Sequence, residues 1–225
     1  MSLRVADRLG VADAVTLANA ALGVVAMTAA VFGRPTAAAR LILLAAVADG
    51  LDGIVARAHG STEVGPYLDS MADIVSFGTA PALFVFAAAR EGWALSEPPL
   101  YALATGVAAV FVVFSLVRTA LYTVYVGEDE TRPGIQNTLA ASILAAGYLA
   151  GVTAVPVVLA VSAVVSALMM APVPYPKLRA RDALAMGVVQ VGAIAAPAAL
   201  GRLFPRALLV AALAYLTLAP RYYRQ

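Results

Sequence analysis

The sequence predicts an all-α protein, a polytopic membrane bundle of about eight transmembrane helices. Of the 225 residues, 62% are hydrophobic and only 12% are charged, and this is about half the charge of an ordinary soluble domain. Apolar stretches follow one another along the chain, most of them near the roughly 20 residues that a membrane-spanning helix needs. Because the composition is uniform throughout, we expect one integral membrane domain over residues 1–225.

Each expected helix is an apolar run that ends at glycine, proline or charged residues. The first run continues to Phe32 without a clean cleavage site, so we expect a retained helix rather than a signal peptide. The last two runs are short and interrupted by proline, which leaves a count of six or seven open. We take a core over about residues 11–171 and two extra helices over about residues 182–218. The expected helices are about Ala12–Phe32, Thr36–Ala58, Gly65–Arg90, Pro99–Val126, Gln136–Ala150, Ala154–Ala171, Asp182–Leu203 and Pro205–Leu218.

Composition also limits the chemistry. Cysteine is absent, which excludes disulfides and thiolate zinc sites. The single histidine, His59, cannot build a histidine metal cluster. A metal ion must therefore be held by oxygen, which favours Mg²⁺ or Mn²⁺. The net charge of +2 is too small to suggest that the protein binds nucleic acid.

Lysine and arginine are distributed unevenly between the two sides of the predicted bundle. If the N-terminus is cytoplasmic, nine of them lie inside and four outside, and cytoplasmic loops normally carry the excess. We therefore expect a cytoplasmic-membrane protein with both termini, and the loop around Ser61, in the cytoplasm. The inner residues are Arg4, Arg8, Arg57, Arg132, Lys177, Arg179, Arg181, Arg221 and Arg224, and the outer ones are Arg34, Arg90, Arg202 and Arg206.

Four aspartates lie within 25 residues of this apolar chain, at positions 49, 52, 69 and 73. Asp49 and Asp52 share a face of the second helix, and Asp69 and Asp73 share a face of the third. Because a short loop joins these helices in antiparallel fashion, all four carboxylates can meet in one groove. Carboxylates at membrane depth are costly and usually bind something. Divalent cations between them would neutralise the charge and hold phosphate oxygens.

The neighbouring residues favour a phosphorylated ligand. Gly50, Gly53 and Ala56 leave a strip without large side chains beside the acids on the second helix. Arg57 follows one residue later, where it can bind a phosphate or a base. Gly65 opens the third helix, whose free N–H groups favour an anion. The residues alone thus predict a metal-dependent site for a phosphorylated substrate at the membrane surface.

The stretch DGLDGIVARAHGSTEVGPYLDSMAD resembles the signature of the CDP-alcohol phosphatidyltransferases. All eight fixed positions of that pattern are present: Asp49, Asp52, Gly53, Ala56, Arg57, Gly65, Asp69 and Asp73. The resemblance implies transfer of a phosphatidyl-type group from a CDP-linked lipid to a small alcohol, with release of CMP. It implies that the four aspartates ligate two divalent cations and that Asp73 is also the general base. It further implies that Gly53, Ala56, Arg57 and Gly65 line the CMP moiety.

The segment after Asp73 indicates the acceptor. Ser76-Phe77-Gly78-x-Ala80-Pro81 is similar to the corresponding run of phosphatidylserine synthases, which implies L-serine as the alcohol. With CDP-archaeol as the lipid, the product would be archaetidylserine. The serine enzymes often carry Arg-x-Ala-Arg-Phe-Asn at the end of the fourth helix. Here only the first arginine is kept, as Arg118, since Leu121 and Thr123 replace the second arginine and the asparagine.

Further polar residues are weaker site candidates. Thr16 and Asn19 lie one turn apart on the first helix and are expected either to face the nucleotide or to bond a neighbouring helix. Arg118, Gln136 and Asn137 are candidates for binding the acceptor, with helix-end snorkelling or capping as the alternatives. A homodimer would be ordinary for the family.

Other functions fit the residues less well. An inositol-phosphate or glycerol-phosphate transferase of the same family would need several basic residues near the site, and only Arg57, Arg118 and Arg132 are obvious. A cation- or proton-coupled transporter would spread its carboxylates along a path through the bilayer, whereas these four cluster near one surface. A structural scaffold would have no use for four buried acids.

Overall fold

A computed structural model of the chain describes residues 8–93, 97–125, 132–176 and 180–222. In these ranges the protein is almost entirely helical, which confirms the predicted fold class. Two two-residue strands, β1 (Arg132–Pro133) and β2 (Pro174–Tyr175), form an antiparallel pair. The helices are α1 (Val11–Val31), α2 (Pro35–His59), α3 (Gly65–Asp73), η2 (Ile74–Thr79), α4 (Ala80–Gly92), α5 (Pro98–Tyr125), α6 (Asn137–Ala150), α7 (Val155–Met169), α8 (Ala180–Ala195) and α9 (Ala199–Tyr222).

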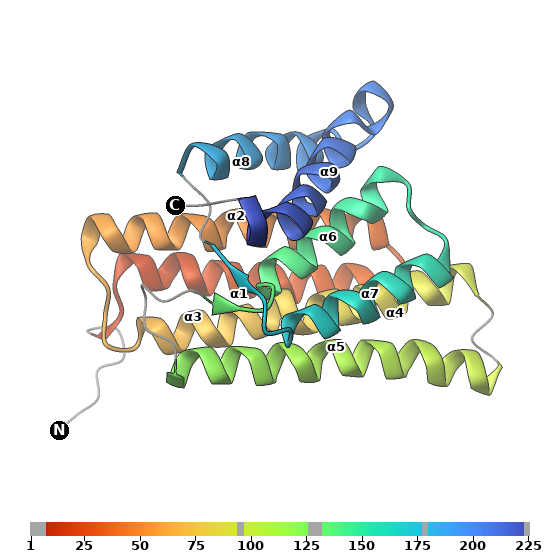
Figure 1. The fold of residues 1–225 in the computed structure, drawn as a ribbon, viewed down its shortest axis with the longest axis horizontal. Helices are drawn as coiled ribbons and strands as arrows, with labels where there is room; N and C mark the ends of the chain where they lie inside the picture. Colours follow the sequence, from red (N-terminus) through yellow and green to blue (C-terminus); the bar gives the residue numbers. More distant parts are fainter. Residues whose placement is uncertain (1–7, 94–96, 126–131, 177–179, 223–225) are drawn as a thin grey trace.

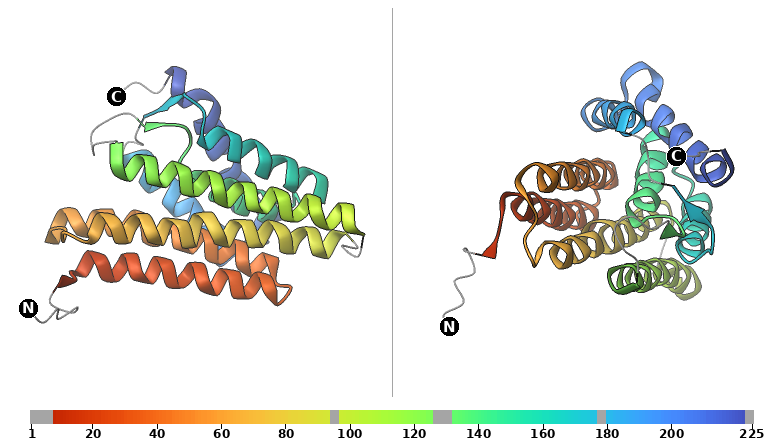
Figure 2. Two further views of the ribbon diagram at one scale, coloured as in Figure 1. Left: turned by 90° about the horizontal axis from the view of Figure 1, so that it is seen from below. Right: turned by 60° about the vertical axis from the view of Figure 1, so that its left-hand side comes forward.

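The long helices lie side by side along the longest axis of the molecule (Figure 1). Helix α1 packs mainly against α2, and helices α6 and α7 cross the bundle at an incline. The α8–α9 pair contacts α2 and α6 and forms a separate layer at one side (Figure 2). With α3, η2 and α4 taken as one continuous helix over 65–92, the described chain has the eight helical segments that the sequence predicts.

The helix over residues 65–92 is the centre of the bundle. It contacts α1, α2, α5, α6 and α7, and most of it is buried. Its middle section, η2, has the wider π-helical geometry, which is rare and often found at functional sites. Gly23 of α1 lies against this section so closely that a Cβ there would be 2.8 Å from the Cα of Ser76. The hydroxyl of Ser76 donates a hydrogen bond to the carbonyl of Asn19 at 2.8 Å, which joins α1 to η2.

Four helical stretches of the described chain are long and apolar enough to span a bilayer: Val11–Val31, Gly65–Gly92, Pro98–Tyr125 and Ala199–Tyr222. Helix α2 has 25 residues, but the charged residues of the motif fall within it. Helices α6 and α7 have 14 and 15 residues, or about 21–23 Å of helix. They are shorter than the hydrocarbon core of about 30 Å. The chain is a multi-pass membrane protein in which not every helix is a full span.

The predicted boundary between the last two helices is wrong. We expected the seventh helix to run to Leu203, but α8 ends at Ala195. Pro197 explains the difference, because a residue before proline avoids the helical conformation. Helix α9 starts at Ala199, and its first turn is interrupted by left-handed residues from Leu200 to Arg202. Pro205 lies in the first turn after that interruption, where the missing N–H of proline costs little.

Two arginines bond carbonyl groups at the ends of helices. Arg90 donates from Nη2 to the carbonyl of Val31 at 2.9 Å, at the end of α1. Arg40 donates from Nε to the carbonyl of Ile194 at 2.6 Å, near the end of α8. A positive charge suits this end of a helix, where carbonyl groups lack partners within the helix. Arg40 therefore also attaches the C-terminal helix pair to α2, the helix that carries Asp49.

Replacing Gly23 by alanine is expected to destabilise the protein by about 1–3 kcal/mol, because the new Cβ would press against the backbone of Ser76. Gly106→Ala is the matched control, since nothing lies within 4 Å of a Cβ at that position of α5. That control should be neutral or slightly stabilising because alanine favours the helix. Thermal unfolding in detergent checks both variants. Equal stability of the two would contradict the close packing of α1 on η2.

Candidate metal and substrate site

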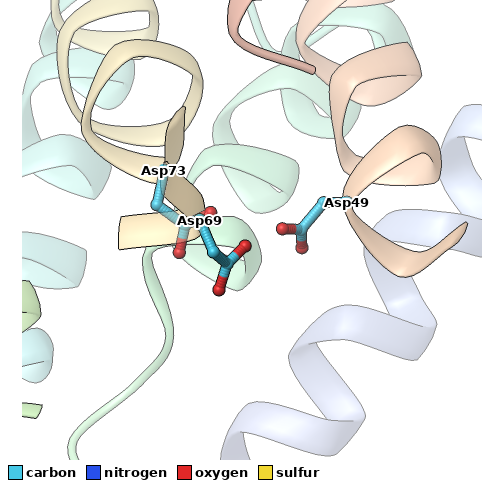
Figure 3. Close-up of side chains that lie close together, drawn as sticks. All are labelled: Asp49, Asp69 and Asp73. Atoms are coloured by element: carbon cyan, nitrogen blue, oxygen red, sulfur yellow. The ribbon is translucent and has the colours of Figure 1, made fainter. Parts of the chain in front are cut away.

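Three carboxylates meet where α2 faces α3. Asp49 comes from α2, and Asp69 and Asp73 come from successive turns of α3. Figure 3 shows the side chains of Asp69 and Asp73 directed toward Asp49. One carboxylate oxygen from each residue lies within 4.8 Å of the other two. We call these three residues the carboxylate triad. The i, i+4 spacing on α3 and the antiparallel hairpin place them together, as the sequence predicts.

Asp52 lies outside this triad. It is 8% exposed, and its Oδ2 accepts a hydrogen bond from the hydroxyl of Thr16 at 2.8 Å. Thr16 belongs to α1, so the bond joins α1 to α2 one turn from Asp49. Asp52 as a fourth metal ligand stays a prediction.

Thr138 belongs to the site although its sequence context gives no sign of it. Its hydroxyl donates to Oδ2 of Asp49 at 3.4 Å from the first turn of α6. That turn is held in place by the segment before it. Gly134 has φ +77 and packs so closely on the end of α7 that a Cβ would lie 2.1 Å from the carbonyl oxygen of Met169. The N–H of Ile135 also bonds the carbonyl of Leu168. No short sequence motif predicts this packing of α6 against α7. The sequence alone therefore could not predict that Thr138 contacts Asp49.

The three acceptor-site candidates lie on α5 and at the start of α6. Arg118 is 6% exposed, its guanidinium lies 4.2 Å from the ring centre of Tyr122, and its positive charge acts on Asp73. Asn137 is buried, and its Nδ2 donates to the hydroxyl of Thr119 at 2.8 Å. Its Oδ1 has no hydrogen-bond partner among the described residues. Gln136 is exposed and precedes the first residue of α6. The structure therefore brings Arg118 to the triad and places Asn137 on the adjoining helix.

The nucleotide candidates divide into surface and buried residues. Arg57 is exposed, and its guanidinium lies over Gly53, where a Cβ would be 3.7 Å from Nη1. Gly65 opens α3, and Ala56 is half-buried on α2. Asn19 is fully buried, and neither polar atom of its side chain has a partner among the described residues. Near the α2–α3 loop there is an open cavity of about 240 Å³ lined by Arg8, Leu9, Thr62, Glu63 and Val64.

The triad fits a hard divalent cation. All three donors are carboxylates, the ligand type that Mg²⁺ and Mn²⁺ prefer. Oδ1 of Asp73 is buried and has no hydrogen-bond partner within the described parts of the chain. Such an oxygen is costly to leave unpaired, and a cation would satisfy it. Like charges at this separation also repel one another, so a bound cation would remove an unfavourable term from the fold.

Taken together, the fold and the site define a multi-pass membrane protein with a carboxylate cluster suited to a divalent cation. The sequence profile described as CDP-alcohol phosphatidyltransferase matches residues 9–174. The chain belongs to the CDP-alcohol phosphatidyltransferase family, and it is an enzyme of that class.

Three relatives illustrate the range of the similarity. An archaetidylserine synthase of Methanothermobacter thermautotrophicus is 27% identical over 178 residues, which cover 78% of this chain and 73% of the relative. A CDP-diacylglycerol–serine O-phosphatidyltransferase of Mycobacterium bovis is 33% identical over 122 residues, or 54% of this chain and 40% of the relative. The inner membrane protein YnjF of Escherichia coli is 36% identical over 99 residues, or 41% of this chain and 48% of the relative.

Asp49→Asn should separate metal binding from folding. We expect Mn²⁺ to raise the unfolding temperature of the wild type. The rise should be much smaller for the variant, because the triad loses a charged ligand. In metal-free buffer the variant should be more stable by about 1 kcal/mol, or about 2–4 °C, since one repulsive charge is gone. Thermal unfolding with and without Mn²⁺ measures both effects.

The control for this experiment is Glu97→Gln, which removes an exposed acid just before α5 and should change neither value. An Asp49→Asn variant with the full Mn²⁺ response would contradict the assignment of Asp49 as a ligand.

Proposed function

We propose that the enzyme transfers a phosphatidyl-type group from CDP-diacylglycerol or CDP-archaeol to the hydroxyl of L-serine and releases CMP. The carboxylate triad carries this proposal, because it supplies the charge that a pyrophosphate substrate requires of the protein. The names of the archaeal and mycobacterial relatives support serine as the acceptor. The whole chain acts as one domain, with the core over about residues 11–171 and the C-terminal pair packed against it.

The four aspartates of the motif would hold two divalent cations, Mg²⁺ or Mn²⁺. Bound there, such ions supply positive charge that stabilises the pyrophosphate and the departing CMP. Asp73 acts as the general base and takes the proton of the serine hydroxyl on its carboxylate. The serine oxygen then forms a bond to the lipid-linked phosphorus, and the bond from that phosphorus to the CMP oxygen breaks.

The other candidates take binding roles. Gly53, Ala56, Arg57 and Gly65 line the CMP moiety, with Arg57 near its phosphate. Thr16 and Asn19 approach the nucleotide from α1, and the bond from Thr16 to Asp52 supports this position. Arg118 binds the serine carboxylate, for which a guanidinium offers two parallel donors. Asn137 and Gln136 complete the acceptor pocket from the start of α6.

The site lies on the cytoplasmic side of the membrane, and the protein forms a homodimer. Sidedness is supported by the excess of lysine and arginine on one side. Of the nine inner residues, Arg4, Lys177, Arg179 and Arg224 lie outside the described part of the chain. Helices α1 and α3 begin at the end of the bundle that holds the triad, which agrees with one surface for the N-terminus and the site (Figure 1).

The acceptor is tested by CMP release from each CDP-lipid with L-serine, myo-inositol phosphate or glycerol 3-phosphate supplied separately. We expect rapid release with L-serine only, because Arg118 can bind one carboxylate and the described residues around the triad include no cluster of basic side chains for a phosphate. Asp73→Asn should reduce release by about 10²–10⁴-fold while circular dichroism stays unchanged. Faster release with a phosphorylated acceptor would contradict serine specificity, and normal turnover by the variant would contradict the general base.

Sidedness can be tested by single-cysteine labelling, because the natural chain has no cysteine. Ser61→Cys lies in the exposed α2–α3 loop, and Glu97→Cys lies at the other end of the bundle before α5. A membrane-impermeant maleimide should label Glu97→Cys in intact cells and Ser61→Cys only in inside-out vesicles. The reverse pattern would place the triad on the outer surface.

A further inference from the structure

Asp13 is a buried carboxylate that belongs neither to the motif nor to the triad. It lies in the first turn of α1 and is 2% exposed. Its Oδ2 accepts two hydrogen bonds, from the N–H of Gly10 at 2.7 Å and from the hydroxyl of Thr62 at 2.8 Å. A carboxylate this deeply buried would be costly without such partners. The two donors come from different segments, so Asp13 joins the start of α1 to the α2–α3 loop.

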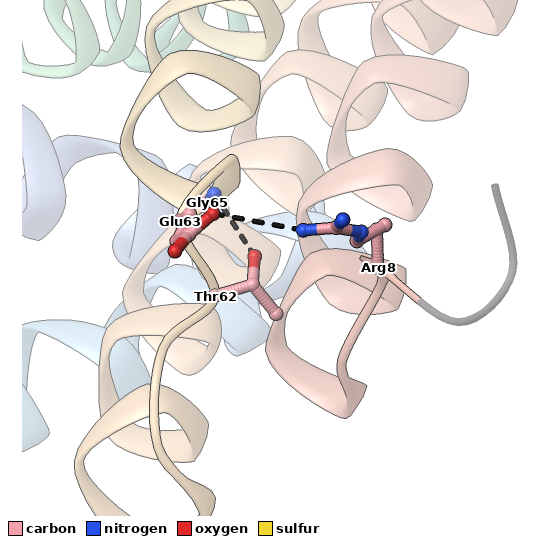
Figure 4. Close-up of polar contacts among 4 residues, drawn as sticks. All are labelled: Arg8, Thr62, Glu63 and Gly65. Carbon is pink, nitrogen blue, oxygen red and sulfur yellow. Dashed lines mark hydrogen bonds and ion pairs between the residues drawn. The ribbon is translucent and has the colours of Figure 1, made fainter. Parts of the chain in front are cut away.

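The chain of hydrogen bonds continues from Thr62 to the start of α3. The N–H of Gly65 donates to Oγ1 of Thr62 at 3.0 Å (Figure 4). Gly65 also packs directly on Asp13, since a Cβ there would lie 3.2 Å from Oδ1. The first residue of α3 is thus held by Asp13 through Thr62 and by direct contact. Gly65 was expected from the resemblance to line the nucleotide, and this contact is an additional reason for glycine at that position.

The position of α3 determines the geometry of the triad. Asp69 lies one turn beyond Gly65, and Asp73 lies one turn further on the same face. An α-helix transmits a shift of its first turn to the next turns because its backbone is rigid. The rest of the α2–α3 loop offers little restraint, since Ser61, Glu63 and Val64 are exposed while Thr62 is half-buried. The partly buried bond from Asp13 to Thr62 therefore helps to set where Asp69 stands relative to Asp49.

We propose that Asp13 is a positioning residue which, through Thr62, holds α3 in the register that brings Asp69 and Asp73 to Asp49. This rests on the proposed function, in which the triad binds divalent cations. Asp13 is not itself a ligand, because its Oδ2 is already occupied by two donors and the cluster of neighbouring carboxylates found in the described chain does not include it. Its carboxylate acts as a hydrogen-bond acceptor.

The chain offers a matched control at the same junction. Arg8 and Glu63 form an ion pair at 3.8 Å between the segment before α1 and the α2–α3 loop, and both side chains are exposed (Figure 4). Exposed pairs of this kind contribute little to stability. If the hydrogen bonds of Thr62 position α3, then Glu63→Gln should leave the Mn²⁺ affinity unchanged, whereas Thr62→Val should lower it strongly.

The test measures Mn²⁺ binding by the full-length protein in detergent. The electron paramagnetic resonance signal of free Mn²⁺ reports how much of the ion remains unbound. We expect Thr62→Val to raise the Mn²⁺ concentration for half-saturation about tenfold, as loss of a group that orients a ligand commonly does. Thr62→Ser keeps the hydroxyl and should bind as the wild type does. Asp13→Asn keeps an acceptor and should change half-saturation by less than about threefold, whereas Asp13→Ala should resemble Thr62→Val.

CMP release provides a second measurement. Saturating Mn²⁺ should restore the turnover of Thr62→Val to near the wild-type value, because the defect lies in metal affinity. The Asp13→Ala/Thr62→Val double variant should bind Mn²⁺ no more weakly than the weaker of the two single variants, since both substitutions remove the same hydrogen bond. If Asp13→Ala does not fold, the Thr62→Val and Thr62→Ser pair carries the test.

The possible failures are distinguishable. Wild-type Mn²⁺ affinity in Thr62→Val overturns the positioning role and leaves the proposed function intact. Loss of Mn²⁺ binding in Asp13→Asn equal to that in Asp13→Ala also overturns it, since the charge rather than the hydrogen bond would then matter. A wild type that binds no Mn²⁺ overturns both the positioning role and the metal-dependent function.

Discussion

The mutual repulsion of Asp49, Asp69 and Asp73 is the constraint on which the rest of the structure depends. Three carboxylates with oxygens within 4.8 Å of one another are unfavourable without a counter-charge. The surrounding bundle must hold them together against this repulsion when no cation is bound. Rigidity at the end of the bundle that contains the triad therefore keeps the three carboxylates close together, as the proposed binding of a divalent cation requires.

The helices supply this rigidity through close backbone contacts and through buried polar links. Gly23 lets α1 rest directly on η2, and Ser76 bonds the α1 backbone beside it. On the other side of the hairpin, α8 is attached to α2 by Arg40 and by Gln190, whose Nε2 donates to the carbonyl of Leu43 at 2.7 Å. The C-terminal pair thus supports the helix that carries Asp49. Small residues make such approaches possible in a membrane, where the hydrophobic effect does not drive helices together.

Sequence reasoning predicted the helical segments, and three of the four aspartates that it expected to meet do lie close together, for local reasons. Hydropathy reports whether a segment can lie in lipid, and a spacing of four on a helix reports which side chains share a face. It failed at the end of α8, where the break lies at Pro197 and not at Pro205. It also missed Thr138 and Asp13. Thr138 reaches Asp49 across contacts between helices, and Asp13 bonds a residue 49 positions away.

The sequence by itself determined the membrane class, the succession of helices and the presence of an acidic motif whose spacing matches the family. These properties follow from composition and from periodicity within one helix. Only the tertiary structure decided that three aspartates converge while Asp52 bonds Thr16, that Thr138 and Arg118 stand beside them, and that Asp13 holds the start of α3. Each of these depends on the distance between side chains of different helices, and such distances are set by the packing of the whole bundle.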